Sequence, residues 1–317
     1  MIQQTIGTVG CIRCACMQDT ANASATLSKT TPERANAQGR ARARPRWRVD
    51  EIDFSHAQTQ HRSDTTLFYL LATSSFIESG SELYTRNLLA YYGSDVEVAD
   101  WLRRVWEPEE LQHGVALRGY IGAVWPDFDW PKAYEAFLTE YARVASPDAF
   151  EATTQLELAA RCMIETGTTS LYQTLLGYAQ EPVLRQVLKH IRDDEVDHYK
   201  YFLRFFRAGQ ARAGQSRIRV AWAIARRVLE SRSDDARIAF RHAFKTNHPE
   251  RRCTGGDFDQ WQSDLKTIFH RAFPFHQAAG MLLAPVALPP FLQRLARSAA
   301  EAALRHALLS QKYRVLR

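Results

Sequence analysis

Two short stretches decide the fold of this chain: WEPEELQHG at residues 106–114 and DEVDH at residues 194–198. Each contains Glu-x-x-His, as Glu110 with His113 and as Glu195 with His198. On a helix this spacing places a carboxylate and an imidazole on one face, about one turn apart, where both can bind one metal ion. One copy could be an ordinary solvated helix face, but two copies indicate a repeated metal-binding unit.

A second pair of matching stretches precedes the two motifs. Residues 77–81 read IESGS and residues 164–168 read IETGT, so that each contains one glutamate, Glu78 or Glu165. Glu78 precedes Glu110 by 32 residues, and Glu165 precedes Glu195 by 30 residues. The spacing predicts one helical hairpin used twice, with six side chains projecting inward: Glu78, Glu110, His113, Glu165, Glu195 and His198.

The hydrophobic pattern is helical from residue 64 onward, with no strand-like alternation of useful length. Helices are predicted over residues 64–92, 95–124, 131–144, 146–180 and 181–208, and Pro108 should kink or divide the second. Two helical pairs joined by a longer crossover predict an all-α, ferritin-like four-helix bundle. Three or four extra C-terminal helices are expected after residue 216, including 258–273 and 290–313.

Charge and composition divide the 317 residues into three predicted parts. Residues 1–62 carry 9 basic and 5 acidic residues without a helical period, which predicts a disordered or loosely attached basic segment. Residues 63–208 carry 13 basic and 22 acidic residues and form the predicted metal-binding bundle. Residues 209–317 carry 19 basic and 8 acidic residues and form a predicted helical extension packed on the bundle. Its basic surface suits an acidic partner.

Composition also excludes several classes of protein. The longest apolar run, residues 280–292, is interrupted by prolines and is too short to span a membrane. Five cysteines are too few for a disulfide scaffold, and the cluster Cys11, Cys14 and Cys16 lacks the fourth ligand of a structural zinc site. No nucleic-acid recognition motif accompanies the basic segments. We therefore expect a cytoplasmic protein that binds no nucleic acid.

Four carboxylates with two imidazoles are the donor set of a dinuclear iron or manganese site. Two Fe ions are the preferred cofactor, with Mn/Fe as the alternative. Four negative charges nearly balance two divalent cations, whereas without metal the glutamates would repel one another.

The first stretch resembles the Trp-x-x-Glu-Glu-x-x-His-Gly motif of soluble acyl-acyl carrier protein desaturases, and the second resembles their Asp-Glu-x-x-His motif. The resemblance covers residues 67–206. It implies that the six side chains are metal ligands, with Glu110 and Glu195 bridging. It also implies that Asp194, and less clearly Glu109, orients a histidine. Thr168 occupies the place of a family threonine implicated in oxygen activation; alternatively, its hydroxyl bonds within its own helix.

The resemblance implies an oxygen-dependent, desaturase-like oxidoreductase that abstracts hydrogen from an apolar small-molecule or carrier-protein-bound acyl substrate. A ferredoxin-like protein would donate electrons, and a homodimer is compatible with this interpretation. Two alternatives stay open: an N-oxygenase or hydroxylase of an amine or aromatic substrate on the same site, and a non-catalytic ferritin-like metal-binding protein. Glu82 is an alternative to Glu78 as ligand, and Glu157 is expected to be a surface group or a neighbour of the ligands.

Overall fold

A computed structural model of the chain describes residues 45–144, 150–212, 214–230 and 234–309. The cluster Cys11, Cys14 and Cys16 lies outside these residues. The described part is all-α and contains no strand. Among its helices, none combines the length and the apolar composition needed to cross a membrane.

The described part of the N-terminal segment packs against the bundle. Three short turns follow one another here: η1 (Val49–Glu51), η2 (Phe54–His56) and η3 (Thr59–His61). Trp47 and Ile52 are buried in the core. For residues 45–62 the prediction of a loose attachment is therefore wrong, because two large apolar side chains anchor this stretch.

The first hairpin begins with α1 (Thr65–Ser79), which the Asp64 carboxylate caps by accepting from the Leu67 N–H. The predicted helix 64–92 is divided at Gly80, and α2 (Ser81–Tyr91) follows. At the division, the Ser79 carbonyl accepts a hydrogen bond from the Tyr134 hydroxyl, 2.7 Å away. A side chain of another helix thus binds a carbonyl at the end of α1.

The return helix of this hairpin has three parts: α3 (Val96–Trp101), the π-helical η4 (Leu102–Trp106) and α4 (Glu107–Val124). Asp95 caps α3 by accepting a hydrogen bond from the Val98 N–H. In η4 the Glu107 N–H donates to the Leu102 carbonyl, five residues back. Pro108 follows immediately and has no N–H to continue the α-helical pattern, so the expected kink takes the form of a wider turn.

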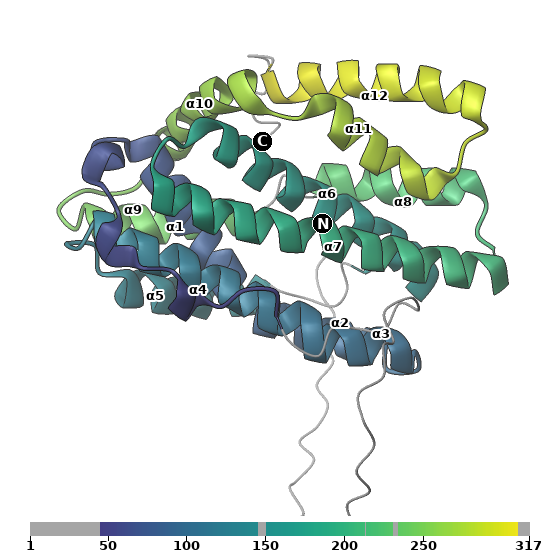
Figure 1. Cartoon of the computed structure of the whole chain (residues 1–317), viewed down its shortest axis with the longest axis horizontal. Coiled ribbons are helices and arrows are strands. Elements are labelled where there is room, and N and C mark those ends of the chain that lie inside the picture. The colour runs from purple at the N-terminus through teal and green to yellow at the C-terminus, as the bar shows by residue number, and fades with distance from the viewer. Residues whose placement is uncertain (1–44, 145–149, 213, 231–233, 310–317) are drawn as a thin grey trace, which may run out of the picture. The chain divides into compact units, whose positions relative to one another are not determined.

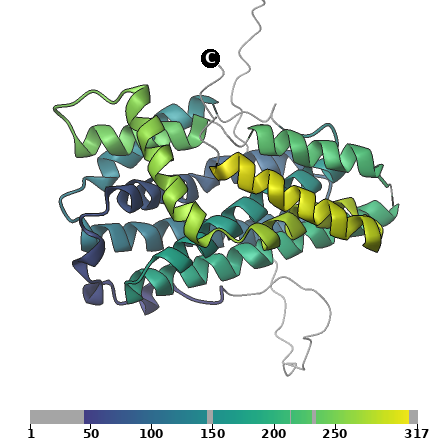
Figure 2. The same cartoon turned by 90° about the horizontal axis from the view of Figure 1, so that it is seen from above.

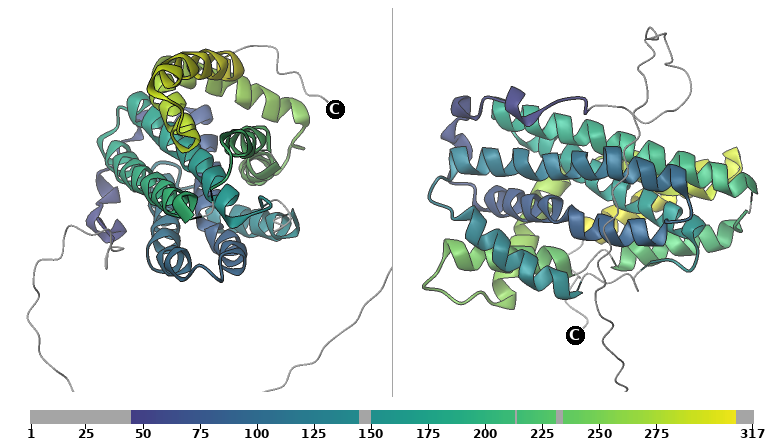
Figure 3. Two further views of the ribbon diagram at one scale, coloured as in Figure 1. Left: turned by 90° about the vertical axis from the view of Figure 1, so that its right-hand side faces the viewer. Right: turned by 90° about the horizontal axis from the view of Figure 1, so that it is seen from below.

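The second hairpin consists of α6 (Thr154–Tyr178) and α7 (Pro182–Arg212), and α5 (Trp130–Val144) lies on the crossover to it. Thr153 caps α6, whereas the predicted start at residues 146–148 lies outside the described residues. Glu181 caps α7 by accepting from the N–H groups of Val183 and Leu184. Helix α1 packs along α4, α6 packs along α7, and α4 contacts α7 (Figures 1 and 3). The predicted ferritin-like four-helix bundle is confirmed.

The core consists of two apolar clusters separated by a polar layer. The first cluster takes residues 67–76, 116–124, 172–175 and 183–191 from α1, α4, α6 and α7. The second takes residues 88–92, 102–106, 156–162 and 199–206. Along each of the four lengths of helix in the bundle (α1 with α2, α3 to α4, α6, and α7), the predicted metal ligands lie between the segments that build these clusters. The layer is therefore enclosed by apolar packing at both ends.

The C-terminal part adds five helices to the described chain: α8 (Arg217–Glu230), α9 (Asp234–Asn247), α10 (Gly255–Ala272), α11 (Phe275–Leu283) and α12 (Pro290–Leu309). A short turn, η6 (Ala284–Val286), follows α11. Helices α8, α10 and α11 pack on α6, and α9 packs on α1 and α5. Helix α12 packs on α10 and α11 and lies in front of the bundle in the view from above (Figure 2). The number of helices exceeds the three or four predicted.

Candidate metal centre

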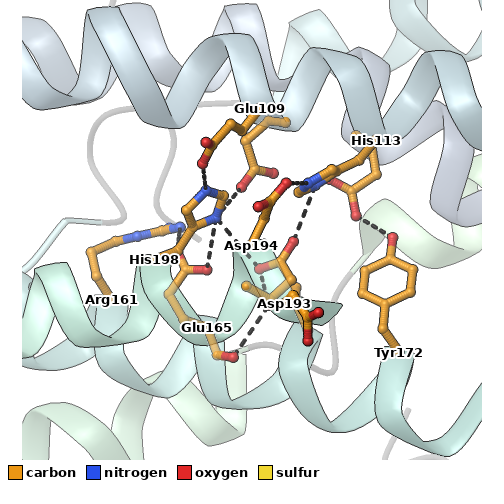
Figure 4. Close-up of polar contacts among 12 residues, drawn as sticks. Glu109, His113, Arg161, Glu165, Tyr172, Asp193, Asp194 and His198 are labelled. Atoms are coloured by element: carbon orange, nitrogen blue, oxygen red, sulfur yellow. Dashed lines mark hydrogen bonds and ion pairs between the residues drawn. The ribbon is translucent and has the colours of Figure 1, made fainter. Parts of the chain in front are cut away.

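The structure brings all six predicted ligands together in the polar layer. Figure 4 labels three of them, His113, Glu165 and His198. Each of the six is buried, with at most 7% of its surface exposed. The six residues form two groups of four, and two residues belong to both groups. Within each group, every residue places one ligand atom within 4.8 Å of the ligand atoms of the other three. Position A consists of Glu78, Glu110, His113 and Glu195, and position B consists of Glu110, Glu165, Glu195 and His198.

The two positions share two carboxylates, as expected of bridging groups. Oε1 of Glu195 lies 3.3 Å from His113 Nδ1, and its Oε2 lies 3.7 Å from His198 Nδ1. Glu195 therefore presents one oxygen to each position. Glu110 belongs to both groups and places Oε1 3.0 Å from His198 Nδ1.

Several buried polar atoms face this cluster without a hydrogen-bond partner in the described part of the chain: His113 Nδ1, His198 Nδ1 and Glu195 Oε1. Carboxylate oxygens lie near both nitrogens but off the line of a hydrogen bond. Unpaired polar atoms are unfavourable in a protein interior. A cation at each position would satisfy them, so the donor set fits two metal ions.

The outer nitrogens of the two histidines are held by acids from the opposite hairpin. His198 of α7 places Nε2 2.9 Å from Oε2 of Glu109 on α4. His113 of α4 places Nε2 3.3 Å from Oδ2 of Asp194 on α7. Such contacts fix the ring orientation of a metal-binding histidine. The predicted orienting contact is thus present for both acids, and each one joins the two hairpins.

Trp47 is a part of the site that sequence reasoning missed. Its indole N–H donates to Oδ2 of Asp194 at 2.7 Å. The indole stacks parallel to the His113 ring at 6.4 Å and to the His190 ring at 4.9 Å. The N-terminal segment therefore supports the acid that orients His113. A tryptophan inside an arginine-rich stretch was the one available signal in the sequence.

Two hydroxyls contact the carboxylates from α6. Thr168 donates to Glu195 Oε2 at 2.7 Å and lies 3.3 Å from the Glu165 carbonyl in its own helix. The Tyr172 hydroxyl donates to Glu78 Oε1. The contacts of Thr168 thus include both the bond within its own helix and a bond to a predicted ligand. The ligand atom is the oxygen of Glu195 that faces position B.

Arg161 is the cation of the site, and sequence reasoning missed it as well. It lies on α6, four residues before Glu165, and its Nη2 is 3.2 Å from Glu165 Oε1. Its Nη1 donates to the Tyr84 hydroxyl at 2.7 Å. The guanidinium lies over the rings of Trp106 and Phe202, 5.5 and 5.4 Å from their centres. Position B therefore has a buried positive charge beside one of its carboxylates.

Burial and the close packing of ionisable side chains shift pKa values in this cluster. Burial opposes charge on His113 and His198, but the surrounding carboxylates outweigh burial and raise the pKa of both imidazoles well above the usual range. Burial and the neighbouring charge of Glu195 raise the pKa of Glu165 to about 8 and that of Glu110 well above its usual range. For Glu195, the two neighbouring histidines overcome burial and lower the pKa well below its usual range.

Gly114 sets the approach of α1 to α4 beside position A. A Cβ atom built on Gly114 would lie 2.3 Å from Ser79 Oγ and 2.7 Å from the Ser79 backbone nitrogen. Real Cβ atoms do not approach so closely, so α1 and α4 would have to separate. The glycine that follows His113 in the motif thus keeps Glu78 within reach of position A.

The remaining candidates lie outside the cluster. Glu82 is exposed and pairs with Arg86 at 3.7 Å, so Glu78 is the residue that enters the site. Glu157 is fully buried on α6, where it accepts from Arg227 of α8 at 2.8 Å. The interpretation of Glu157 as a surface group is therefore wrong. The centre of the Trp106 ring lies 6.3 Å from that of His198, so Trp106 lies beside the cluster.

Comparison with known proteins gives distant likenesses only. No family model matches, and no curated protein matches. A mutant R2-like ligand-binding oxidase with an aerobically reconstituted Mn/Fe cofactor matches 84% of this chain and 89% of its own, at 17% identity and a TM-score of 0.43. Another structure of an R2-like ligand-binding oxidase with this cofactor matches 84% and 88%, at 15% identity and a TM-score of 0.37. These likenesses do not show the expected closeness to acyl-acyl carrier protein desaturases.

Proposed function

We propose that this chain is an oxygen-dependent oxidoreductase with a dinuclear Fe/Fe or Mn/Fe centre at positions A and B. The observation that carries the proposal is the pair of buried four-ligand groups that share Glu110 and Glu195. Oxygen donors with one imidazole for each metal suit Fe(II) and Mn(II). Four glutamates also offset the charge of two divalent ions.

The protein's own residues hold the ions and shape their surroundings. Glu78 and Glu165 would each bind one ion, and Glu110 and Glu195 would bind both. Glu109 and Asp194 keep the imidazoles in place. When bound, the two metal ions supply the redox chemistry that reduces O2 at the expense of an oxidisable substrate. The apolar clusters at both ends of the layer keep bulk water away from that chemistry.

Thr168 is the residue we propose to act beside the metals. Its hydroxyl donates to Glu195 Oε2, the oxygen that faces position B, and the residue is only partly buried. A donor at this place can position a small molecule or a proton next to the bridging carboxylate.

The substrate class proposed is an apolar chain, and the resemblance of residues 106–114 to the desaturase motif supports it. An acyl chain on an acidic carrier protein, with electrons from a ferredoxin-like donor, suits the basic residues 209–317. N-oxygenation or hydroxylation of an amine or aromatic substrate would use the same ligands, and so would iron storage without turnover.

The test is anaerobic loading with Fe(II), measurement of bound iron, and stopped-flow absorbance after mixing with O2. We expect about two iron ions per chain and an iron-dependent visible absorbance change. Glu110→Ala should lose both, because Glu110 belongs to both positions. Glu82→Ala is the matched control, since this glutamate is exposed one turn after Glu78.

Different outcomes separate the alternatives. No bound iron and no absorbance change would refute a dinuclear centre. Iron oxidation that never consumes a substrate would indicate storage. Product analysis with acyl chains and with arylamines would distinguish a desaturase from an N-oxygenase.

A further inference from the structure

Each position has one carboxylate that the other lacks, Glu78 at position A and Glu165 at position B. The two positions differ in the group that donates a hydrogen bond to this carboxylate. At position A the neutral hydroxyl of Tyr172 donates to Glu78. At position B the guanidinium of Arg161 donates to Glu165 at 3.2 Å. The difference is present in the repeat itself, because Ser74 precedes Glu78 by four residues just as Arg161 precedes Glu165.

Arg161 is fixed in this place. Only 4% of its surface is exposed, and the hydroxyl of Tyr84 and the faces of Trp106 and Phe202 surround its guanidinium. Its Nε has no hydrogen-bond partner among the residues that the structure describes. Leaving Glu165 would bury an unpaired cation, which is strongly unfavourable. The arginine therefore stays beside Glu165 when metal binds.

A fixed guanidinium acts on a metal at position B in two ways. It occupies Oε1 of Glu165, which leaves Oε2, 3.9 Å from His198 Nδ1, as the free oxygen. It also places a positive charge next to a site for a positive ion, in a buried environment where screening is weak. At position A, the corresponding tyrosine carries no charge.

Resting on the proposed dinuclear centre, we infer that Arg161 makes position B the weaker metal site, so that the two ions bind in order, A before B. Ordered binding gives the chain a means of holding two different metals. The first ion binds at position A, and the second ion binds at position B, where the charge of Arg161 makes the environment different. Arg161 is thus a positioning residue that acts through Glu165.

A purely structural role for Arg161 would leave the ratio of the two affinities unchanged. In that case the arginine would only offset the negative charge of the carboxylates in the metal-free protein. Its removal would lower the free energy of unfolding and leave metal binding unchanged. The ratio of the first to the second dissociation constant for one metal is therefore the quantity to measure.

The experiment is an anaerobic titration of the full chain with Mn(II), with free Mn(II) followed by electron paramagnetic resonance. We expect two equivalents, the second binding at least about tenfold more weakly than the first. In Arg161→Met the second equivalent should tighten until the two are nearly equal, while Arg161→Lys should keep the gap. Arg192→Met is the control for loss of an arginine, because Arg192 contacts Gln173 and Asp193 and no predicted ligand.

Two ligand variants assign the positions without removing Arg161. Glu165→Gln should keep one tight equivalent, and Glu78→Gln should keep one weak equivalent. These variants decide the order of binding, A before B, even if Arg161→Met does not fold. Equal affinities in the wild type, an unchanged ratio in folded Arg161→Met, or a tight site in Glu78→Gln would overturn it while leaving a dinuclear centre in place. No Mn(II) binding at all would overturn the proposed function and this inference with it.

Discussion

Replacing Gly114 with alanine tests how the helix packing builds position A. The new Cβ would lie 2.7 Å from the Ser79 nitrogen and 3.0 Å from its Cα, which are backbone atoms that no side-chain rotation can move. The end of α1 must therefore shift away from α4. Glu78 is the neighbour of Ser79 and His113 is the neighbour of Gly114, so the shift separates two ligands of the same position.

The magnitude follows from two opposing effects. Overpacking in a close helix contact costs about 1–3 kcal/mol, and contacts this short belong to the upper part of that range. Alanine gains about 1 kcal/mol over glycine inside a helix, which offsets part of the loss. We expect a net loss of about 2 kcal/mol, or about 3 °C in melting temperature for a chain of this size, since the entropy of unfolding is about 2.1 cal/mol/K per residue.

The assay combines thermal unfolding of the metal-free protein with Mn(II) titration. Gly114→Ala should lose one equivalent of Mn(II), that of position A, and keep the other. Gly122→Ala is the matched control on the same helix, because its Cβ would meet nothing within 4 Å. This control should be slightly more stable than the wild type and should bind both equivalents.

One result would refute the reasoning: a Gly114→Ala protein as stable as the wild type that binds two equivalents with unchanged affinity. Such a protein would show that α1 and α4 separate easily without moving Glu78 from His113. If Gly114→Ala does not fold, its yield of folded protein is compared with that of Gly122→Ala, which carries the same substitution at an open position. A folded Gly122→Ala would then attribute the loss to the contact with Ser79.

Three further predictions concern the groups around the ligands. Glu109→Gln should weaken one Mn(II) equivalent about 10- to 100-fold by releasing His198, and unchanged affinities would contradict this. Trp47→Phe should lower the free energy of unfolding by about 2 kcal/mol in denaturant titrations, because Asp194 loses a donor to its charge; a loss within error would show that the contact is unimportant. Since the raised pKa values keep His113 and His198 protonated in the metal-free protein at neutral pH, Mn(II) must displace protons. Its affinity should therefore fall as the pH is lowered from about 8 to about 6, and a pH-independent affinity would argue against proton displacement.

Much of this fold was predictable because the ligand motifs fix the register of four helices at once. Glu-x-x-His occurs twice at a matching distance from an upstream glutamate, so the helices and the inward faces of α1, α4, α6 and α7 follow from one repeat. Helix ends were predictable where a capping side chain stands in the sequence, as at Asp64 and Asp95. The division between α1 and α2 at Gly80 was not predictable. The Ser79 carbonyl at this point accepts from the hydroxyl of Tyr134, a residue 54 positions beyond Gly80 in the chain.

The missed parts of the site have a common physical origin. Trp47 lies in a segment without periodicity, so no pattern indicated that it is buried against Asp194. Glu157 and Arg161 lie on one face of α6 with Glu165, at intervals of four residues. Charges at that spacing on an otherwise apolar helix indicate burial with partners, but the partners, such as Arg227, come from helices that only the tertiary structure brings near.

The reciprocal contacts between the hairpins bear on how such a chain could have arisen. Glu109 of the first hairpin holds His198 of the second, and Asp194 of the second holds His113 of the first. One hairpin by itself would contain three of the four ligands of one position, one of the four of the other, and no support for its own histidine. Two identical copies around a twofold axis would complete both positions. A half-length ancestor would thus have needed only self-association to bind metal. Fusion of the two copies would then have let each copy change independently. Ser74 and Arg161, which stand at the same place in the two copies, are one such difference.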